Sequence, residues 1–218
     1  VRVNPDILSP TPHEYTRTGH AESKFGLPVQ VAVGLYRWAA TRPHLRIRGI
    51  DVHIGSQIVE PGPYKRALRS VLEIVHLLRK EGIHLEYLDL GGGFGIPYTG
   101  AGMDIPALAA ELVPLLKGTG LKLVLEPGRA LVGEAGALVA RVMGLKRAGN
   151  KTFVITDAGM TELLRPSHYG AYHGILPVAE DGARETALVD VVGPICETGD
   201  FLARDRDLPL PREGELLL

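Results

Sequence analysis

Three short clusters of residues have the groups that could bind a phosphate. The first is His53-Ile54-Gly55-Ser56, the second is the run Gly91–Gly93, and the third is Glu126-Pro127-Gly128-Arg129. Glycine turns expose backbone N–H groups, serine adds a hydroxyl and arginine adds a planar cation, and all of these bind phosphate oxygens. Consecutive glycines also weaken any regular element. The sequence therefore predicts that a ligand closely approaches this backbone.

The glutamate and the histidine in these clusters indicate what else the ligand carries. A carboxylate such as Glu126 would be repelled by a phosphate unless the ligand also has a cationic group at its other end. Pyridoxal phosphate has a phosphate, a flat ring on which His53 could stack, and a ring nitrogen that a carboxylate keeps protonated. The residues therefore predict a pyridoxal-phosphate site. A barrel that binds a phosphosugar is disfavoured, because it gives Glu126 no role.

Each cluster follows a stretch with the pattern of a short buried strand. We predict strands at residues 1–4, 47–53, 85–90 and 121–126, with helices at 28–42, 63–82 and 105–118 between them. Alternating strands and helices of this size predict an α/β fold with a parallel sheet, and four such units would make half of a (β/α)8 barrel. Ligands bind at the carboxyl ends of barrel strands, so the three clusters are expected to converge there.

The pattern changes after Arg129. Segments 130–147, 151–157, 185–193 and 208–218 have the composition of β structure, with no helices of comparable length between them. We therefore expect residues 1–129 to be a barrel portion and residues 130–218 to begin a mainly β C-terminal domain that is incomplete. Both ends of the chain fall in strand-like runs, and the chain is expected to be the interior of a longer polypeptide.

The composition argues against nucleic acid and membrane as partners. The 24 basic and 25 acidic residues give a formal net charge of −1, so no strongly basic surface is expected. No apolar run approaches the ~18 residues of a membrane span. The single cysteine, Cys196, excludes an intrachain disulfide and makes the reducing cytoplasm the expected location. No histidine or cysteine has the spacing of a metal ligand set, so no metal site is expected.

Five motifs, in the right order, resemble those of the fold-type III pyridoxal-phosphate-dependent decarboxylases. They are VHIGSQ (52–57), LDLGGGFG (88–95), EPGR (126–129), RPSHY (165–169) and GPICETGD (193–200). The resemblance covers most of the chain. It implies that residues 1–129 correspond to strands five to eight of the family's barrel and that residues 130–218 begin its β domain.

The resemblance gives each cluster a role in holding pyridoxal 5'-phosphate. His53 would stack on the cofactor ring, and Glu126 would pair with the pyridine nitrogen. The residues that would bind the phosphate and complete the cofactor site are Ser56, Gly91, Gly92, Gly93, Gly128 and Arg129.

The resemblance also implies a substrate. Arg165 and Tyr169 match residues that bind the far, non-reacting end of diaminopimelate, and Arg129 would reach substrate as well. Glu197 would bind the far amino group, while Cys196 would be the catalytic proton donor. In the family this Cys-Glu segment enters the active site of the other subunit, so a homodimer is implied. The implied reaction is decarboxylation of meso-2,6-diaminopimelate to L-lysine and CO2, the last step of lysine biosynthesis.

One family feature is missing from this sequence. The lysine that joins the cofactor as a Schiff base lies in a Tyr-Ala-x-Lys type motif, which the chain lacks. The lysines that are present lie in a βα loop, on amphipathic helices or in β segments without a cofactor motif. We therefore expect that these 218 residues could not catalyse the reaction unaided.

Other interpretations remain open at this point. Ornithine, arginine and carboxynorspermidine decarboxylases share the cofactor motifs, and a non-catalytic homologue could keep the same fold. Ornithine has no far carboxylate, so Arg165 and Glu197 together favour diaminopimelate. Taken singly, His53 could be a packed core histidine, the glycines a tight turn, and Cys196 an inert buried thiol.

Overall fold

The computed structural model describes residues 1–7, 10–13, 18–19, 23–179 and 184–218. The chain divides into two units, Val1–Ala135 and Gly136–Leu218, and each is described by itself. In the described ranges, no helix combines the length and the apolar character needed to cross a membrane.

A parallel sheet forms the centre of the first unit. Its strands β3 (Gly49–Asp51), β4 (Tyr87–Asp89) and β5 (Lys122–Val124) pair in this order and all run in one direction. Strand β1 (Val3–Asn4) pairs in parallel with the short β2 (Leu27–Pro28), and a parallel bridge from Arg2 to Asp51 joins β1 to β3.

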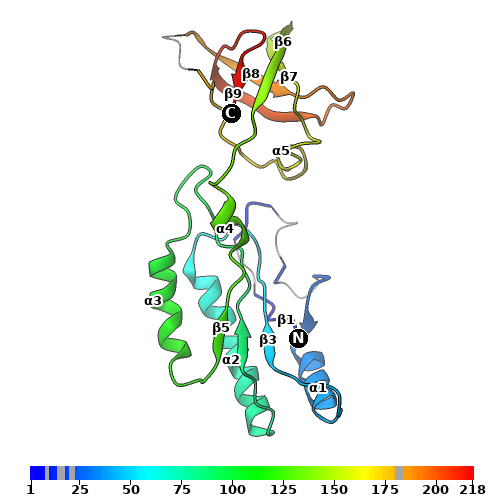
Figure 1. Ribbon diagram of the computed structural model, residues 1–218, viewed down its shortest axis with the longest axis vertical. Helices are drawn as coiled ribbons and strands as arrows, with labels where there is room; N and C mark the ends of the chain where they lie inside the picture. The colour runs from blue at the N-terminus through cyan, green and yellow to red at the C-terminus, as the bar shows by residue number, and fades with distance from the viewer. Residues whose placement is uncertain (8–9, 14–17, 20–22, 180–183) are drawn as a thin grey trace. The chain divides into compact units, whose positions relative to one another are not determined.

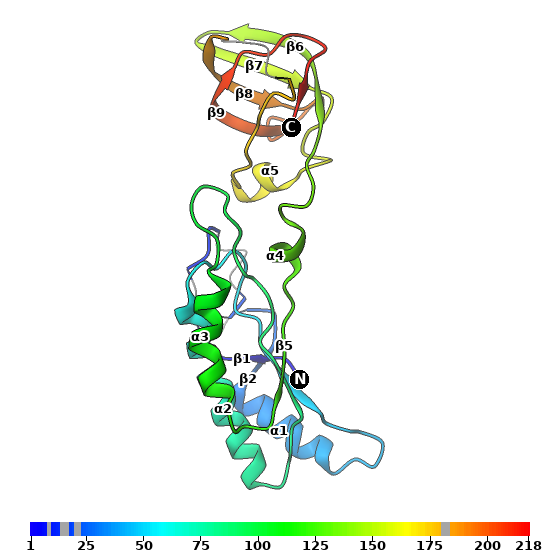
Figure 2. The same ribbon diagram turned by 60° about the vertical axis from the view of Figure 1, so that its left-hand side comes forward.

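Three helices pack against this sheet. They are α1 (Val29–Ala40), α2 (Pro61–Lys80) and α3 (Ile105–Leu116), and Figures 1 and 2 show them running alongside the strands. Apolar residues spaced three or four apart along α2 are buried, among them Tyr64, Leu68, Val71 and Leu78. They cover the sheet residues Ile50, Val52, Leu88 and Leu90, each at most 1% exposed. Burial of this apolar surface is the main stabilisation of the unit.

Alternation along the strands separates the core from the site. Every second residue points to the helices, so the residues between them share the opposite face of the sheet. Asp51 pairs with Asp89 in the register of this sheet. Two residues further along each strand, the same register places His53, Gly91 and Glu126 side by side. The hydrogen bond from the Glu126 N–H to the Gly91 carbonyl (2.9 Å) extends the pairing of β4 and β5 to this point.

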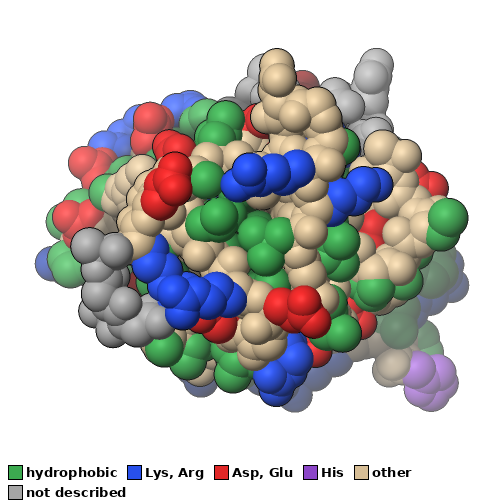
Figure 3. All heavy atoms as spheres, turned by 90° about the horizontal axis from the view of Figure 1, so that it is seen from above, with side chains coloured by type: hydrophobic (Ala, Val, Ile, Leu, Met, Phe, Trp, Pro, Cys, Tyr) green, Lys and Arg blue, Asp and Glu red, His purple; other side chains and the backbone are tan. Residues whose placement is uncertain are grey.

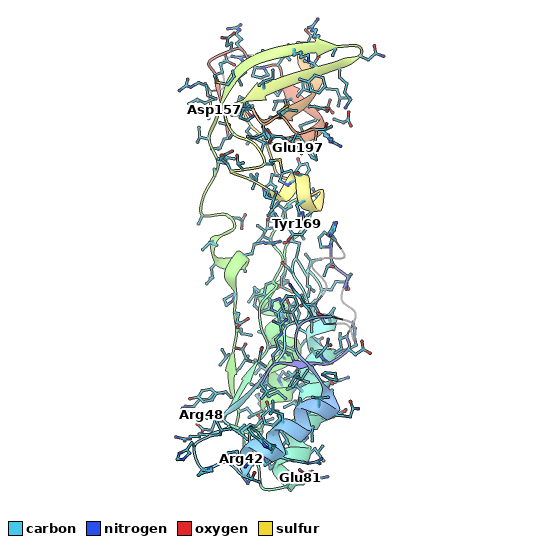
Figure 4. All side chains as sticks on the ribbon, turned by 90° about the vertical axis from the view of Figure 1, so that its right-hand side faces the viewer. Arg42, Arg48, Glu81, Asp157, Tyr169 and Glu197 are labelled. Atoms are coloured by element: carbon cyan, nitrogen blue, oxygen red, sulfur yellow. The ribbon has the colours of Figure 1, made fainter. Side chains whose placement is uncertain are left out.

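The amino ends of the same strands carry ion pairs. Arg48, just before β3, donates to Glu86, just before β4, at 2.6 Å. At the carboxyl ends of the helices, Arg37 of α1 donates to Glu81 after α2 at 2.5 Å. Figure 4 labels Arg48, Arg42 and Glu81 at this end of the first unit. These exposed pairs contribute little energy individually, and the cofactor motifs all lie at the other end of the strands.

The second unit is a five-stranded mixed sheet in the order β10–β6–β7–β8–β9. Its strands are β6 (Ala140–Ala148), β7 (Lys151–Thr156), β8 (Thr186–Val192), β9 (Phe201–Pro209) and β10 (Leu216–Leu217). Their core consists of residues such as Val142, Val154, Val189 and Leu208. A short helix, α4 (Gly128–Val132), precedes the unit, and α5 (Arg165–Tyr169) lies between β7 and β8.

Seen from above, the second unit presents both signs of charge interspersed with hydrophobic side chains (Figure 3). No single sign dominates this face. The view agrees with the near balance of charge in the sequence.

The predicted fold class is confirmed: parallel strands alternate with helices in the first part, and β structure dominates the second. One local prediction was wrong. Residues 130–139 were predicted as β, but α4 and a turn occupy most of that stretch. The charged run 204–207 lies within β9, where Arg204, Asp205 and Asp207 are exposed. Asp205 has φ +47°, and the pairing shifts between Val189 and Val191, so a bulge hides the alternation of a strand there.

Candidate active site

His53 lies just beyond β3 and is held in one orientation. Its Nδ1 accepts a hydrogen bond from the Gly92 N–H at 3.2 Å, and its side chain is 24% exposed. Burial, together with the nearby Arg2 guanidinium, lowers the pKa of His53 below its usual value. The imidazole is therefore neutral near pH 7, and its proton is on Nε2, because Nδ1 is the acceptor. The contact between His53 Nδ1 and Glu126 Oε2, at 3.9 Å, is therefore not an ion pair.

Residues Gly91–Gly93 must be glycines because neighbouring backbone occupies the space of a side chain. A Cβ on Gly92 would overlap the carbonyl oxygen of Glu126, and one on Gly93 would overlap that of Gly55. Gly91 and Gly93 also have φ values of +70° and +89°, which other residues rarely adopt. The close approach that the sequence predicted is therefore made, in the first place, by adjacent loops of the protein itself.

The amides of this glycine run differ in what they bind. The Gly91 N–H donates to Asp89 Oδ1 at 2.9 Å, and the Gly92 N–H donates to His53. The Gly93 N–H meets no acceptor among the residues that the structure describes, and Gly93 is partly exposed. Of the three amides, that of Gly93 is the one available to a ligand.

Glu126 and Gly128 follow β5 on the same edge. The side chain of Glu126 is 58% exposed, and its backbone N–H is fixed by the Gly91 carbonyl. Gly128 donates its N–H to the Glu126 carbonyl at 2.8 Å. Gly128 itself is exposed, and a Cβ on it would meet no atom of the described residues within 4 Å.

Gln57 connects the first cluster to the third, and its role was not predicted. Its Oε1 accepts from Arg129 Nη1 at 3.1 Å and from the Ile96 N–H at 3.2 Å, while its Nε2 donates to the Ile96 carbonyl. Gln57 has φ +60°, an unfavourable conformation that these three bonds offset. Gln57 thereby orients Arg129 and fixes the turn that contains the partly exposed Ser56. Its place in the motif VHIGSQ was the only signal in the sequence.

A pair of carboxylates lies one level below His53 and Gly91. Asp51 and Asp89 face each other across β3 and β4, and Asp51 Oδ1 is buried without a hydrogen-bond partner in the described part of the chain. Burial and the Asp89 charge raise the pKa of Asp51 to about 6. Neither Asp51 nor Asp89 was among the site residues predicted from the sequence.

The donor set of the first unit fits pyridoxal phosphate. The Gly93 amide, the Ser56 hydroxyl and the Arg129 guanidinium are phosphate donors. Glu126 offers an exposed carboxylate, and His53 offers a flat, neutral ring held at a fixed angle.

In the second unit, two loops leave the same edge of the sheet because β7 and β8 are parallel neighbours. The loop 157–164 leads from β7 into α5, and the loop 193–200 follows β8. The two lie close together, since a Cβ on Gly199 would be 3.5 Å from the Ser167 Oγ of α5. Figure 4 labels Tyr169 on α5 and Glu197 on the loop. The structure therefore brings the predicted substrate residues of this unit to one edge.

The four predicted residues of this edge are accessible. Arg165 and Tyr169 are partly exposed, and Arg165 Nη1 donates to His173 Nε2 at 3.1 Å. This bond makes His173 a partner of Arg165. Glu197 is exposed, with one carboxylate oxygen accepting the Gly199 N–H at 3.1 Å. Cys196 is also exposed, so a buried structural thiol does not describe it.

Comparison with known proteins agrees with the motifs. Residues 1–133 match the family model described as pyridoxal-dependent decarboxylase, pyridoxal binding domain. The chain is 46% identical over 220 aligned residues to the diaminopimelate decarboxylase of Aquifex aeolicus, covering 100% of this chain and 52% of the relative. The diaminopimelate decarboxylase of Neisseria meningitidis serogroup B is 47% identical with the same coverage. The chain thus spans about half the length of the curated relatives it matches.

Solved structures give the same result. Diaminopimelate decarboxylase from Helicobacter pylori, complexed with L-lysine, matches with a TM-score of 0.93 and 37% identity, covering 99% of this chain and 54% of that one. A lysine/ornithine decarboxylase from Vibrio vulnificus, complexed with cadaverine, matches with a TM-score of 0.80 and 28% identity, covering 89% and 53%. The resemblance and the cofactor predicted from the sequence are confirmed: this chain belongs to the family of pyridoxal-dependent decarboxylases.

Proposed function

We propose that the polypeptide to which this chain belongs decarboxylates meso-2,6-diaminopimelate to L-lysine and CO2 with pyridoxal phosphate. The observation that carries the proposal is the identity of 46% with a diaminopimelate decarboxylase, which extends through both units. The Helicobacter pylori relative was solved with L-lysine, the product of this reaction. In this proposal residues 1–129 are the barrel portion and residues 130–218 are the β-domain portion.

The residues at the carboxyl ends of β3, β4 and β5 would hold the cofactor. Bound pyridoxal phosphate supplies an electron sink for the electrons left at the α-carbon when CO2 departs. His53 would stack on the ring, with its imidazole held in one orientation by the bond from Gly92 and kept neutral by its buried surroundings. Glu126 keeps a proton on the ring nitrogen, which strengthens the electron sink. Ser56, Gly93 and Arg129 would donate to the phosphate. Gly91, Gly92 and Gly128, whose N–H groups are bonded within the protein, would shape the cofactor site.

The residues at the edge of the second unit would read the substrate. Arg165 and Tyr169 bind the far carboxylate, because a guanidinium and a phenol are both donors to it. Arg129 also contacts substrate from the first unit. Glu197 binds the far ammonium group, and the exposed Cys196 returns a proton to the α-carbon. Cys196 and Glu197 serve the active site of a partner subunit in a homodimer. A working thiol favours the cytoplasm, where it stays reduced.

A second candidate is decarboxylation of lysine or ornithine, since a lysine/ornithine decarboxylase matches at 28% identity. These substrates lack a far carboxylate, so they give the Arg165 guanidinium no charged partner. A non-catalytic homologue would likewise have no use for the exposed Cys196 beside Glu197.

The test is Arg165→Ala in the intact, cofactor-loaded polypeptide. We expect kcat/KM for diaminopimelate to fall about 100-fold, the loss of one charge-assisted pair to substrate. The visible absorbance of bound cofactor should stay unchanged. Arg141→Ala is the matched control, because Arg141 lies on β6 and its Nη1 donates to the Gly214 carbonyl rather than to any predicted substrate residue. Unchanged turnover in the Arg165 variant would refute the assignment.

A further inference from the structure

Asp200 is a buried carboxylate whose role nothing above explains. Asp200 is the last residue of the loop 193–200 and is 3% exposed. Oδ1 accepts the Met160 N–H at 2.6 Å, and Oδ2 accepts the Ile195 N–H at 2.6 Å. Hydrogen bonds to a carboxylate are about twice as strong as those between neutral groups. One side chain therefore joins two loops that are 35 residues apart along the sequence.

The surroundings of Asp200 are shaped around its carboxylate. A Cβ on Gly193 would lie 2.6 Å from Gly159 Cα and equally close to Asp200 Oδ1, and a Cβ on Gly159 would overlap the carboxylate. Two glycines thus allow the two loops to touch and to enclose the charge. The backbone of Asp200 adds bonds within its own loop, from its N–H to the Glu197 carbonyl at 2.9 Å and from the Gly193 N–H to its own carbonyl at 3.1 Å.

The two loops continue into the residues that would read the substrate. Met160 lies in the loop 157–164, which leads directly to Arg165 and Tyr169 on α5. Ile195 precedes Cys196 and Glu197. The Glu162 carboxylate accepts the Gly159 N–H at 2.8 Å and stiffens the first loop on its own side. Asp200 bonds to both loops at once, and the Thr156 hydroxyl, which donates to the carbonyls of Ala158 and Val192, links their starts.

We propose that Asp200 is a positioning residue that holds the Arg165–Tyr169 helix and the Cys196–Glu197 loop in one fixed arrangement. The functional part of this inference rests on the function proposed above. In the proposed homodimer, where the Cys196–Glu197 loop serves the partner's site, Asp200 would connect the substrate-reading segments of two active sites. Loss of its carboxylate should disturb both segments together.

The test uses Asp200→Asn in the intact, cofactor-loaded polypeptide. An amide keeps the shape of the side chain but turns a donor toward one of the two N–H groups. We expect the Met160 and Ile195 amides to exchange hydrogen at least about tenfold faster in the variant. Alkylation of Cys196 by iodoacetamide should also accelerate, because the loop that carries it is loosened.

Asp190→Asn is the matched control. Asp190 is also buried, at 7% exposure, and its carboxylate binds Lys151 and the Asp205 N–H. This variant should lower the melting temperature without changing exchange at Met160 or Ile195. Faster exchange at Ile195 alone would mean that Asp200 only closes its own turn, and unchanged exchange at both would mean that it holds neither loop. Either result overturns the proposal.

A kinetic measurement separates this inference from the proposed function. If diaminopimelate is the substrate, Asp200→Asn should raise KM and lower kcat together, with the cofactor absorbance unchanged. If the wild-type protein does not turn over diaminopimelate, the proposed function fails while the exchange and alkylation results still decide the role of Asp200. If the variant does not fold, wild-type exchange across a denaturant series decides instead. The Met160 and Ile195 amides should then open with one common free energy, and two different values would overturn the coupling.

Discussion

At the scale of single residues, the site is built by backbone packing before any ligand is considered. Gly92 and Gly93 lie against the carbonyls of Glu126 and Gly55, so the ends of three strands touch. This contact places His53, Glu126 and the Gly93 amide around one space. From the sequence, we predicted that these glycines allow a ligand to approach the backbone. In the structure they first allow neighbouring backbone to approach. Contacts between loops far apart in the chain leave no local signal.

The first prediction concerns Gly92→Ala. The added methyl group overlaps the Glu126 carbonyl, so either β4 or β5 must shift, and we expect a loss of about 2–4 kcal/mol in the free energy of unfolding. Urea titration measures this loss. Gly100→Ala is the control, because a Cβ there meets no described atom within 4 Å. A Gly92 variant as stable as the Gly100 variant would contradict the packing described.

The second prediction concerns pH and Asp51. Its pKa is about 6 in the folded chain and near the ordinary 3.8 when unfolded, so between these values the folded state binds more protons. Stability contributed by protonated Asp51 is therefore present at low pH and is lost as pH rises through about 6. Asp51→Asn should remove this loss, which we expect to be on the order of 1 kcal/mol after allowing for solvent screening of a half-exposed group.

Melting of wild type and Asp51→Asn between pH 4 and pH 7 measures the difference. The gap between the two curves should widen in favour of the variant as pH rises. Parallel curves would show that Asp51 has an ordinary pKa.

At the scale of elements, local pattern predicted what local physics determines. The three helices of the first unit and its strands follow from apolar spacing and from proline at helix starts. Strand β9 was missed because Asp205 forms a bulge whose existence depends on its partner β8. Gln57 was missed for a similar reason, since its partners Ile96 and Arg129 come from other loops. Periodicity carries no information about such contacts.

The third prediction tests the start of α3. Asp104 caps this helix, because its side chain accepts the Ala107 N–H at 2.9 Å. Asp104→Ala should cost about 1 kcal/mol of stability. Glu60 stands at the same position before α2 but makes no side-chain cap bond, so Glu60→Ala should change stability far less. Equal losses, measured by thermal melting, would show that the cap does not stabilise α3.

At the scale of the whole molecule, residues 1–133 match a pyridoxal binding domain, but no lysine lies beside the predicted cofactor residues in the described part of the chain. Lys122 is the lysine on a strand of the first unit's sheet, and its Nζ lies 5.7 Å from the Tyr87 ring. Glu126 is four residues further, which is about 13 Å along an extended strand. The other lysines lie on helices, in loops or in the second unit: Lys24, Lys65, Lys80, Lys117, Lys146 and Lys151.

The fourth prediction follows from this placement. The 218-residue chain, incubated with pyridoxal phosphate and reduced with borohydride, should keep its original mass. The intact polypeptide should gain one reduced cofactor under the same conditions. Circular dichroism of the shorter chain is the control for folding. A specific adduct on a lysine of this chain would show that the site contains a reactive amine where the structure places none.

The central claim is tested most directly by the substrate preference of the intact, cofactor-loaded polypeptide. CO2 release should be measured from meso-diaminopimelate, ornithine, lysine, arginine and carboxynorspermidine in parallel. The account predicts the highest kcat/KM for diaminopimelate, by about 100-fold or more, because only this substrate fills both the Arg165 and the Glu197 positions with opposite charges. A higher kcat/KM for ornithine or lysine, or CO2 release that does not depend on pyridoxal phosphate, would contradict it.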